Sequence, residues 1–359
     1  MKRTRIYSGI IALMATFMVL AVLTPAHALE AKLSGQVSQL AMWADDGDED
    51  DFFVGDNDNS STRFRFTGEE AFGAVKAGFQ IELEAQKYAS NKMSMAEGVD
   101  DSDESFNVDD RIMNVYFDTQ VGKFEIGQGD GAANGTSEVD LSGTSVITYS
   151  DVTATAGAFQ WKDSDGELFG GTIGATRNNL DGLSRNQRLR YNTPTFGGFY
   201  AAGSVTNDEG WELAGWYSAE IYGKLAAGIG YVDSGDRYIE DDADFTQLAG
   251  SVSWLLPMGL NFTAALGERD YEDDDLEDGM NYYLKVGYKW SIHAVSVEYG
   301  MTEDLMVENL ESSHYGAAYV INPWKPVEFF AAYRNYMADL DGDEPEDIQQ
   351  IMAGTRIKF

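Results

Sequence analysis

Arginine residues occur at alternate positions in two stretches of the chain. Arg63 and Arg65 lie in the run Arg-Phe-Arg-Phe, and Arg188 and Arg190 lie in the run Arg-Leu-Arg-Tyr. Successive side chains of a β-strand point to opposite faces, so each pair is expected to share one face while its apolar neighbours occupy the other. A guanidinium group stays hydrated at a wet surface, where it attracts or repels charged solutes. These residues therefore indicate electrostatic chemistry.

Acidic residues that could oppose these arginines lie in Gly127–Asn186, which is too long for an ordinary loop. The acidic candidates within it are Asp130, Glu138, Asp140 and Asp151. Facing groups of opposite charge set up a transverse field, which orients dipolar solutes and disfavours apolar ones. A further arginine, Arg111, has an ambiguous orientation because three apolar residues share its side of the expected strand. The alternative is that the arginines are solvated wall residues, or ion-pair partners that pin the long segment.

Catalytic signals are weak. The chain has no Cys, which excludes disulfides, thiolate metal sites and cysteine nucleophiles. After residue 28 the only histidines are His293 and His314, and neither a G-x-S-x-G nor an H-E-x-x-H motif occurs. The glycine spacing that begins at Gly127 faintly resembles a dinucleotide loop, but no amphipathic helix follows it. The formal charge of −35 argues against nucleic acid as a partner. We therefore expect no enzymatic activity.

The first 28 residues predict a cleaved signal peptide. Lys2, Arg3 and Arg5 form a basic start, Ile10–Leu23 is apolar, and Ala-His-Ala at positions 26–28 matches a cleavage site. A transmembrane anchor is the alternative, but fourteen apolar residues are short for a span. We expect one domain over residues 29–359, and no later segment approaches the ~20 apolar residues of a membrane helix.

The rest of the chain predicts an all-β protein. In Val75–Ala85 every odd position is apolar and every even position is Lys, Gly, Gln or Glu, which is typical of a strand with one wet face. About sixteen such strands are expected, at 31–44, 60–68, 75–85, 111–118, 122–129, 187–193, 197–206, 211–220, 222–232, 244–255, 258–268, 281–290, 294–301, 312–321, 326–336 and 347–359.

A closed transmembrane barrel explains this pattern better than a soluble β-sandwich. Both have one apolar face per strand, but here the other face is charged or Gly, and aromatic residues gather at strand ends as in a membrane girdle. Lipid tolerates no open sheet edge, so Asp347–Phe359 must pair with Ala31–Ala44. The small inward residues Gly78, Gly287 and Gly300, together with Gly354, favour an open lumen over a filled one.

The connections between strands are unequal. Tight turns are expected at 193–197, 220–222, 256–259, 290–293 and 321–326, whereas segments 44–60, 97–110, 270–278 and 337–347 hold 28 of the 60 acidic residues. Membrane barrels carry their longer loops outside, so the acidic side faces outward. The run from Asp339 to Glu344 begins like a calcium loop but lacks the required Gly. No cofactor is expected, apart from divalent cations such as calcium held loosely at these loops.

Two arrangements are open for residues 152–177. They could form an extra hairpin that raises the strand count to eighteen. We favour the alternative, in which they belong to one long insertion that folds into the lumen.

Several motifs make the chain similar to the general porins of Gram-negative outer membranes. They are Leu-Ser-Gly-Gln-Val-Ser-Gln-Leu-Ala-Met from Leu33, Arg-Phe-Arg-Phe-Thr-Gly-Glu-Glu from Arg63, Phe-Glu-Ile-Gly-Gln-Gly-Asp from Phe124, Arg-Leu-Arg-Tyr-Asn-Thr-Pro-Thr-Phe-Gly-Gly-Phe from Arg188, and the terminal Lys358-Phe359. Each motif alone is weak, but their order, the leader and the terminal Phe together are specific to that family.

The resemblance implies a homotrimeric barrel of sixteen strands in the outer membrane, in contact with its lipid and lipopolysaccharide, with the third loop folded inward as an eyelet. It implies a basic wall of Arg63 with Arg65 beside it, Arg111, and Arg188 or Arg190, facing acidic residues among Asp130, Glu138, Asp140 and Asp151. It also implies that Phe359 is read by the barrel-assembly machinery. The loop lacks the Pro-Glu-Phe-Gly-Gly-Asp run of the enterobacterial form, so the identity of the lining acids stays open.

The expected function is passive diffusion of small hydrophilic solutes and ions, with a weak cation preference because the acidic mouth concentrates cations. The wall arginines could reverse this preference. The alternatives are an anion-specific or substrate-specific channel, and a non-conducting surface barrel that acts as an adhesin or phage receptor.

Overall fold

The computed structural model describes residues 30–95, 106–235, 244–273, 275–305, 307–340, 342–343 and 345–359. The expected leader over residues 1–28 lies outside the described residues, as do part of the acidic segment 97–110 and two positions of the calcium-like run, Asp341 and Glu344.

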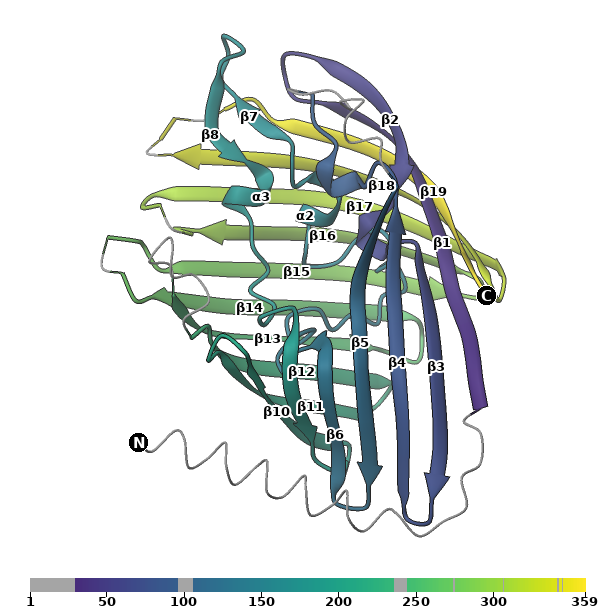
Figure 1. The fold of residues 1–359 in the computed structure, drawn as a ribbon. Helices are drawn as coiled ribbons and strands as arrows, with labels where there is room; N and C mark the ends of the chain where they lie inside the picture. The colour runs from purple at the N-terminus through teal and green to yellow at the C-terminus, as the bar shows by residue number, and fades with distance from the viewer. Residues whose placement is uncertain are drawn as a thin grey trace.

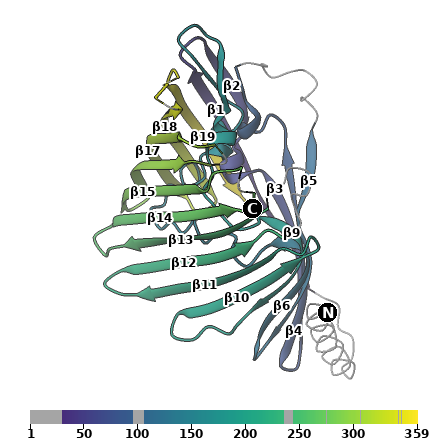
Figure 2. The ribbon, with the colours of Figure 1, turned by 90° about the vertical axis from the view of Figure 1, so that its left-hand side faces the viewer.

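Strands that wrap around a common interior make up most of the chain (Figures 1 and 2). The strands of the barrel are β1 (Glu30–Asp45), β2 (Asp50–Asp56), β3 (Arg63–Phe72), β4 (Val75–Gln86), β5 (Asn107–Thr119), β6 (Gly122–Asp130), β9 (Arg185–Asn192), β10 (Phe199–Thr206), β11 (Trp211–Glu220), β12 (Lys224–Asp233), β13 (Phe245–Leu255), β14 (Leu260–Tyr271), β15 (Gly279–Trp290), β16 (His293–Glu303), β17 (Leu310–Trp324), β18 (Val327–Leu340) and β19 (Ile348–Lys358). β2 and β3 both pair with β1, along its two halves. They therefore form one interrupted strand, and the closed antiparallel barrel has sixteen, which confirms the predicted fold.

The other elements lie in the connections. They are η1 (Asp58–Ser60), η2 (Ser90–Lys92), α2 (Thr153–Ala156), β7 (Gln160–Lys162), β8 (Leu168–Thr172) and α3 (Ile173–Thr176). Among the described residues, none of the helices combines the length and the apolar content needed to cross a membrane.

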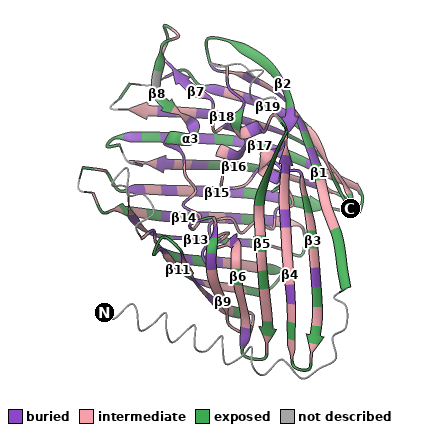
Figure 3. Ribbon diagram, in the orientation of Figure 1, coloured by how far each residue is buried: buried purple, intermediate pink, exposed green. Residues whose placement is uncertain are grey.

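Exposure alternates along strands such as β15, which indicates the residues that face outward (Figure 3). In β15, Leu284, Val286 and Tyr288 are exposed, whereas Lys285 and Gly287 between them are buried. An isolated chain in water would not expose such an apolar band, but a barrel in lipid must. The sequence periodicity therefore identified the outer surface correctly.

The last strand closes the barrel against the first. β1 and β19 pair from Gln36 opposite Lys358 to Asp45 opposite Gln349, and the backbones of Gly35 and Phe359 exchange two N–H···O bonds of 3.0 Å. This confirms the pairing expected for the C-terminal stretch.

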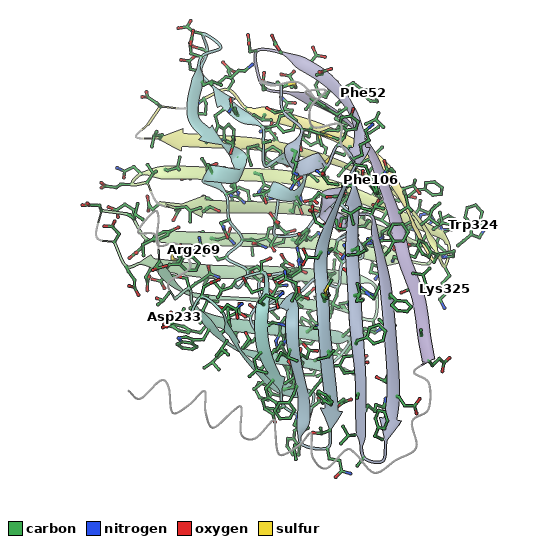
Figure 4. All side chains as sticks on the ribbon, viewed as in Figure 1. Phe52, Phe106, Asp233, Arg269, Trp324 and Lys325 are labelled. Carbon is green, nitrogen blue, oxygen red and sulfur yellow. The ribbon has the colours of Figure 1, made fainter. Side chains whose placement is uncertain are left out.

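The acidic segment 44–60 differs from the expectation of a plain connection. Its residues Asp50–Asp56 form β2, which pairs with the upper half of β1, and the turn is only Asp46–Glu49. Phe52 is exposed on the outer side, as Figure 4 shows, and Phe53 is buried. The alternation was obscured because three of the seven strand residues are Asp. The prediction of a loop was wrong for these residues.

Residues 160–172 correct the expectation for the long insertion. A hairpin does form, but β7 and β8 make a separate two-stranded sheet, so the barrel count stays at sixteen. The hairpin lies beside the β1–β2 turn (Figure 1), where Lys162 Nζ is 2.9 Å from Asp46 Oδ2 and 3.3 Å from Asp48 Oδ2. This part of the insertion therefore sits at the long-loop end rather than deep in the lumen.

The remainder of the insertion fills one side of the barrel. An apolar core joins it to inward residues of β1, β2 and β16–β19, and includes Leu40, Met42, Phe53, Val146, Ile147, Phe159, Trp161, Ile173, Val320, Phe330, Ile348 and Met352. Two of the inward glycines serve this contact: a Cβ at Gly287 would lie 3.0 Å from Ser142, and one at Gly300 would lie 3.0 Å from Arg177 as well as 2.5 Å from His314 of β17. Here these glycines make room for the insertion instead of leaving open space.

Buried polar contacts fix the insertion to the same wall. Lys285 Nζ donates to Asp140 Oδ2 at 2.8 Å and to the Thr148 carbonyl at 2.6 Å. Arg334, which is held by Glu298 at 2.8 Å, donates to Thr155 Oγ1 at 2.8 Å. A buried ion pair contributes little net stability, but the loss of one partner strands the other in a dry environment. These contacts therefore specify where the insertion sits.

We expect Lys285→Met to destabilise the protein by about 3–5 kcal/mol, because the carboxylate of Asp140 is then buried without a cation. The measurement is the free energy of unfolding in detergent. Lys289→Met, an exposed position on the same face of β15, is the matched control and should change little. The double variant Lys285→Met/Asp140→Leu should recover most of the loss; a single variant as stable as the parent would contradict this role.

Candidate functional site

Two polar cavities occupy the part of the lumen that the insertion leaves open. The outer cavity, toward the long-loop end, has a volume of about 850 Å³. The inner cavity, toward the tight-turn end, has a volume of about 550 Å³ and reaches Thr193 and Thr195 in the β9–β10 turn. The two cavities share three lining residues, Arg65, Ile112 and Asp130, which therefore mark the place where they meet.

Charged side chains dominate the outer cavity. Its six basic residues are Arg63, Arg65, Lys92, Arg111, Arg185 and Arg269. Its eight acidic residues are Asp58, Glu82, Glu84, Asp109, Asp130, Glu138, Asp151 and Asp181. Of the residues singled out in the sequence, Arg63, Arg65, Arg111, Asp130, Glu138 and Asp151 are thus brought together here.

Three of the predicted arginines converge on one carboxylate that the sequence reasoning missed. Glu82 on β4 is buried, and it lies 2.6 Å from Nε of Arg65, 3.2 Å from Nε of Arg111 and 3.4 Å from Nη1 of Arg63. A second carboxylate, that of Glu84, accepts from Arg111 Nη1 at 2.8 Å. The available signal was cross-strand register, because Glu82 faces Arg65 and Glu84 faces Arg63 once β3 and β4 pair.

A β-bulge resolves the ambiguous orientation of Arg111. Between Glu82 and Leu83 of β4 the pairing shifts from Ile112 to Asp110 on β5, so Arg111 is the extra residue. Bulges re-aim side chains, and here Arg111 and Ile112 both line the outer cavity while Met113 is exposed on the outer face. Strict alternation fails at this point, which is why the sequence pattern could not assign it.

Arg188 and Arg190 hold the start of the insertion. Arg188 donates to the carbonyls of Asp130 at 2.6 Å and Gly127 at 3.1 Å, and to the Glu125 carboxylate at 2.8 Å. Arg190 donates to the Gly131 carbonyl at 2.7 Å. Both line the inner cavity, not the outer one. They match the alternative in which the arginines pin the long segment.

Asp140 lies apart from the other predicted acids. Its carboxylate forms the buried pair with Lys285 and lines neither cavity. Asp181, which was not singled out from the sequence, lines the outer cavity in its place. It accepts from the backbone N–H of Gly135 at 2.6 Å and of Ser137 at 3.1 Å, so it shapes the loop while its side chain borders the outer cavity. The sequence pattern gives no sign of this contact, because a loop carboxylate here binds backbone N–H groups that are distant in the chain.

Burial and mutual repulsion weaken the acidity of three outer-cavity carboxyls. Burial raises the pKa of Asp58 to about 6, with Glu84 and Asp151 adding to the shift. Burial likewise raises the pKa of Asp181 to about 6, against hydrogen bonds that lower it. The pKa of Glu138 is raised well above its usual range by burial and by Asp181 and Asp151. The charge of this cavity therefore changes between mildly acidic and neutral pH.

Neither His293 nor His314 lines the outer or the inner cavity. His314 is buried, with Nδ1 3.0 Å from Arg177 Nη2, and His293 Nδ1 lies 2.7 Å from the Tyr319 hydroxyl. Within the described ranges, no three His, Asp or Glu side chains converge as metal ligands would. The arrangement is suited to holding and sorting charged or dipolar solutes in water.

Comparison with known proteins gives a consistent result. A family model described as Gram-negative porin matches residues 14–342, and no curated protein sequence matches. Similar solved structures include an anion-selective porin from Comamonas acidovorans, with a TM-score of 0.65, 16% identity, and coverage of 92% of this chain and 100% of that chain. OmpT, an outer membrane protein of Vibrio cholerae described in one structure as a trimer form, has a TM-score of 0.59, 15% identity, and coverage of 93% and 100%. The outer membrane channel DcaP of Acinetobacter baumannii has a TM-score of 0.58, 14% identity, and coverage of 94% of this chain and 100% of that chain. At these identities the structural likeness establishes the fold.

Removal of one outer-cavity cation should change ion preference. Arg63→Gln is expected to raise the cation-to-anion permeability ratio roughly twofold, because one fixed positive charge is lost within a Debye length of passing ions. The measurement is the reversal potential in a KCl gradient. Arg188→Gln, which removes a cation of the inner cavity, is also expected to lower thermal stability, since it removes contacts to the carbonyls of Asp130 and Gly127. An unchanged reversal potential for Arg63→Gln would remove Arg63 from the ion path.

Acidification should lower the cation-to-anion permeability ratio, which is the opposite of the change expected for Arg63→Gln. Protonation of Asp58 and Asp181 removes negative charge as pH falls through about 6, so the reversal potential should shift toward anions between about pH 8 and about pH 5. The Asp58→Asn/Asp181→Asn double variant should show a smaller shift over the same range. Identical pH profiles for the two proteins would rule out these carboxyls as the titrating groups.

Proposed function

The chain belongs to the Gram-negative porin family and is an outer-membrane β-barrel channel, and from this premise we propose that small hydrophilic solutes and ions cross it by passive diffusion, with a weak cation preference at neutral pH. The family and the fold indicate a channel rather than an enzyme. The alternative within transport is a channel specific for anions or for one substrate.

The observation that carries the proposal is the pair of polar cavities that meet inside a closed barrel. Their linings are rich in ionised and amide side chains, while the apolar residues of the strands face outward. A water-filled path of this kind favours solutes that keep their hydration, and it penalises apolar ones because ordered water and fixed charges must be displaced. The place where the cavities share Arg65, Ile112 and Asp130 is the proposed size filter.

A cation preference is supported by the charge balance at the outer end. Eight acids and six bases line the outer cavity, and the connections on that side hold a large share of the acidic residues. The arginines of the wall are partly neutralised, since Arg65 and Arg111 each contact a carboxylate within 3.2 Å. If the arginine cluster outweighs the acids, the channel is instead expected to prefer anions. The anion-selective porin from Comamonas acidovorans shares the fold at 16% identity, and this likeness does not decide between the two preferences.

We also propose a homotrimer in the outer membrane, in contact with lipid and lipopolysaccharide. The trimer form of OmpT supports the oligomer. Phe359, whose ring lies 6.0 Å from that of Phe64 at the closing seam, is proposed as the residue read by the barrel-assembly machinery. The external acids are proposed to attract divalent cations loosely.

A non-conducting surface barrel is the second candidate. It is favoured by the apolar core that joins the insertion to the wall, because that core obstructs part of the lumen. The two functions differ in whether the remaining cavities connect for ions.

Purified protein in a planar bilayer distinguishes these functions. The current is expected to increase in discrete steps as single channels insert, and a KCl gradient should give a reversal potential whose sign indicates cation preference. A barrel that inserts without any conductance would overturn the channel proposal. A reversal potential of the opposite sign would favour the anion-specific alternative.

A further inference from the structure

The two cavities carry opposite charge balances. The outer cavity has two more acidic than basic side chains, and it still has one more when Glu138, whose pKa is raised well above its usual range by burial, is left out. The inner cavity is lined by four basic residues, Arg65, Lys123, Arg188 and Arg190, and by only two acidic ones, Glu125 and Asp130. The sign of the fixed charge therefore changes along the lumen, near the residues that the cavities share.

The positive charge of the inner cavity is only partly cancelled by its contacts. Arg65 is paired with Glu82, a residue of the outer cavity, which leaves three cations against Glu125 and Asp130. Glu125 serves two cations at once, pairing with Lys123 and with Arg188 Nη2. Arg190 has no carboxylate partner in the described part of the chain: its hydrogen bonds go to Asn192 Oδ1 at 3.0 Å and to the carbonyls of Asp130 and Gly131. A surplus of cationic groups thus faces the water of this cavity.

Asp130 does little to offset this surplus. Its carboxylate lies 3.9 Å from Arg185 at the boundary with the outer cavity, where Arg185 also lies. Its contacts with Arg188 and Arg190 are made through the backbone carbonyl, not through the carboxylate. The inner cavity therefore concentrates small anions, such as chloride or carboxylates, for the same reason that the outer cavity concentrates cations.

We propose that the lumen is a junction of a cation-holding outer cavity and an anion-holding inner cavity, and that the channel therefore rectifies current. The inference rests on the proposed channel function. When the long-loop side is positive, cations enter through the negative cavity and anions through the positive cavity, so both accumulate at the junction and conductance is high. The opposite polarity draws both kinds of ion away from the junction, and conductance falls.

The test is the current–voltage curve of single channels in symmetric KCl at about pH 8, where Asp58 and Asp181, with pKa values of about 6, are ionised. At about 0.1 M salt the Debye length is about 10 Å, and at about 1 M it is about 3 Å. We expect currents about twofold larger with the long-loop side positive at the lower salt, and a nearly linear curve at the higher salt, because fixed charges are then screened.

The orientation of each channel in the bilayer is identified through a single introduced cysteine, which is unique because the chain has none of its own. Asn207, exposed in the turn between β10 and β11 on the long-loop side, is changed by Asn207→Cys, biotinylated and capped with streptavidin. Streptavidin added to the long-loop side reduces the current, which identifies that side for each channel.

Two variants test the assignment of charge. Lys123→Gln removes one inner cation, and Asp109→Asn removes one outer anion at an exposed position of β5; both should bring the current ratio closer to one. Lys325→Gln is the matched control, because Lys325 lies in the β17–β18 turn (Figure 4) and lines neither cavity. Its ratio should equal that of the parent.

The outcomes separate the two proposals. Conduction with a linear curve at low salt, or with larger current when the tight-turn side is positive, would overturn the junction while leaving the channel function intact. Equal effects of Lys123→Gln and Lys325→Gln would also overturn it. Complete absence of current would instead refute the channel function on which the junction depends.

Discussion

In the hydrocarbon core of a membrane no water is present to pair with backbone N–H and C=O groups, so a β-sheet must satisfy every one of them internally. The seam between β1 and β19 meets this requirement, because ten residues of each strand pair in register. Closure has a second effect, since it gives the sheet an inside and an outside. Apolar side chains can then face lipid, and every charged side chain of the strands must find water or a partner within the lumen. The arginine clusters, their carboxylate partners and the two cavities all follow from that division.

The lumen combines two kinds of interior. Beside β1 and β16–β19 the insertion forms an apolar core with the wall, with buried contacts from Lys285 and Arg334 that determine its position. Beside β3–β6 the wall is polar, and the cavities remain. The insertion therefore does more than narrow the channel, because it also selects which face of the barrel the solutes meet. That face is the one where Glu82 gathers three arginines.

The strands could be predicted from the sequence because period-two alternation is local information, and each of the sixteen expected stretches is a strand. The failures have physical causes. β2 was hidden because aspartates occupy positions where a strand usually shows uncharged residues, and Arg111 could not be assigned because a bulge interrupts the alternation on which the argument depends. Asp140 was grouped with the lining acids since sequence shows its charge but not its partner, Lys285, which is 145 residues away. Glu82 was visible as an inward residue, and only the pairing of β3 with β4 reveals its role.

The apolar core of the lumen also constrains the order in which the molecule can be built. Its residues come from the insertion, from the first strands and from the last ones, including Met42 on β1, Phe330 on β18 and Met352 on β19. Until the C-terminal strand has reached the N-terminal one, the insertion has only part of the surface against which Phe159 and Trp161 are buried. Final docking of the insertion is thus coupled to the last step of strand pairing, so the bore of the channel is set only when the cylinder is complete. An incompletely folded barrel would then differ from a finished one in its permeability as well as in its stability.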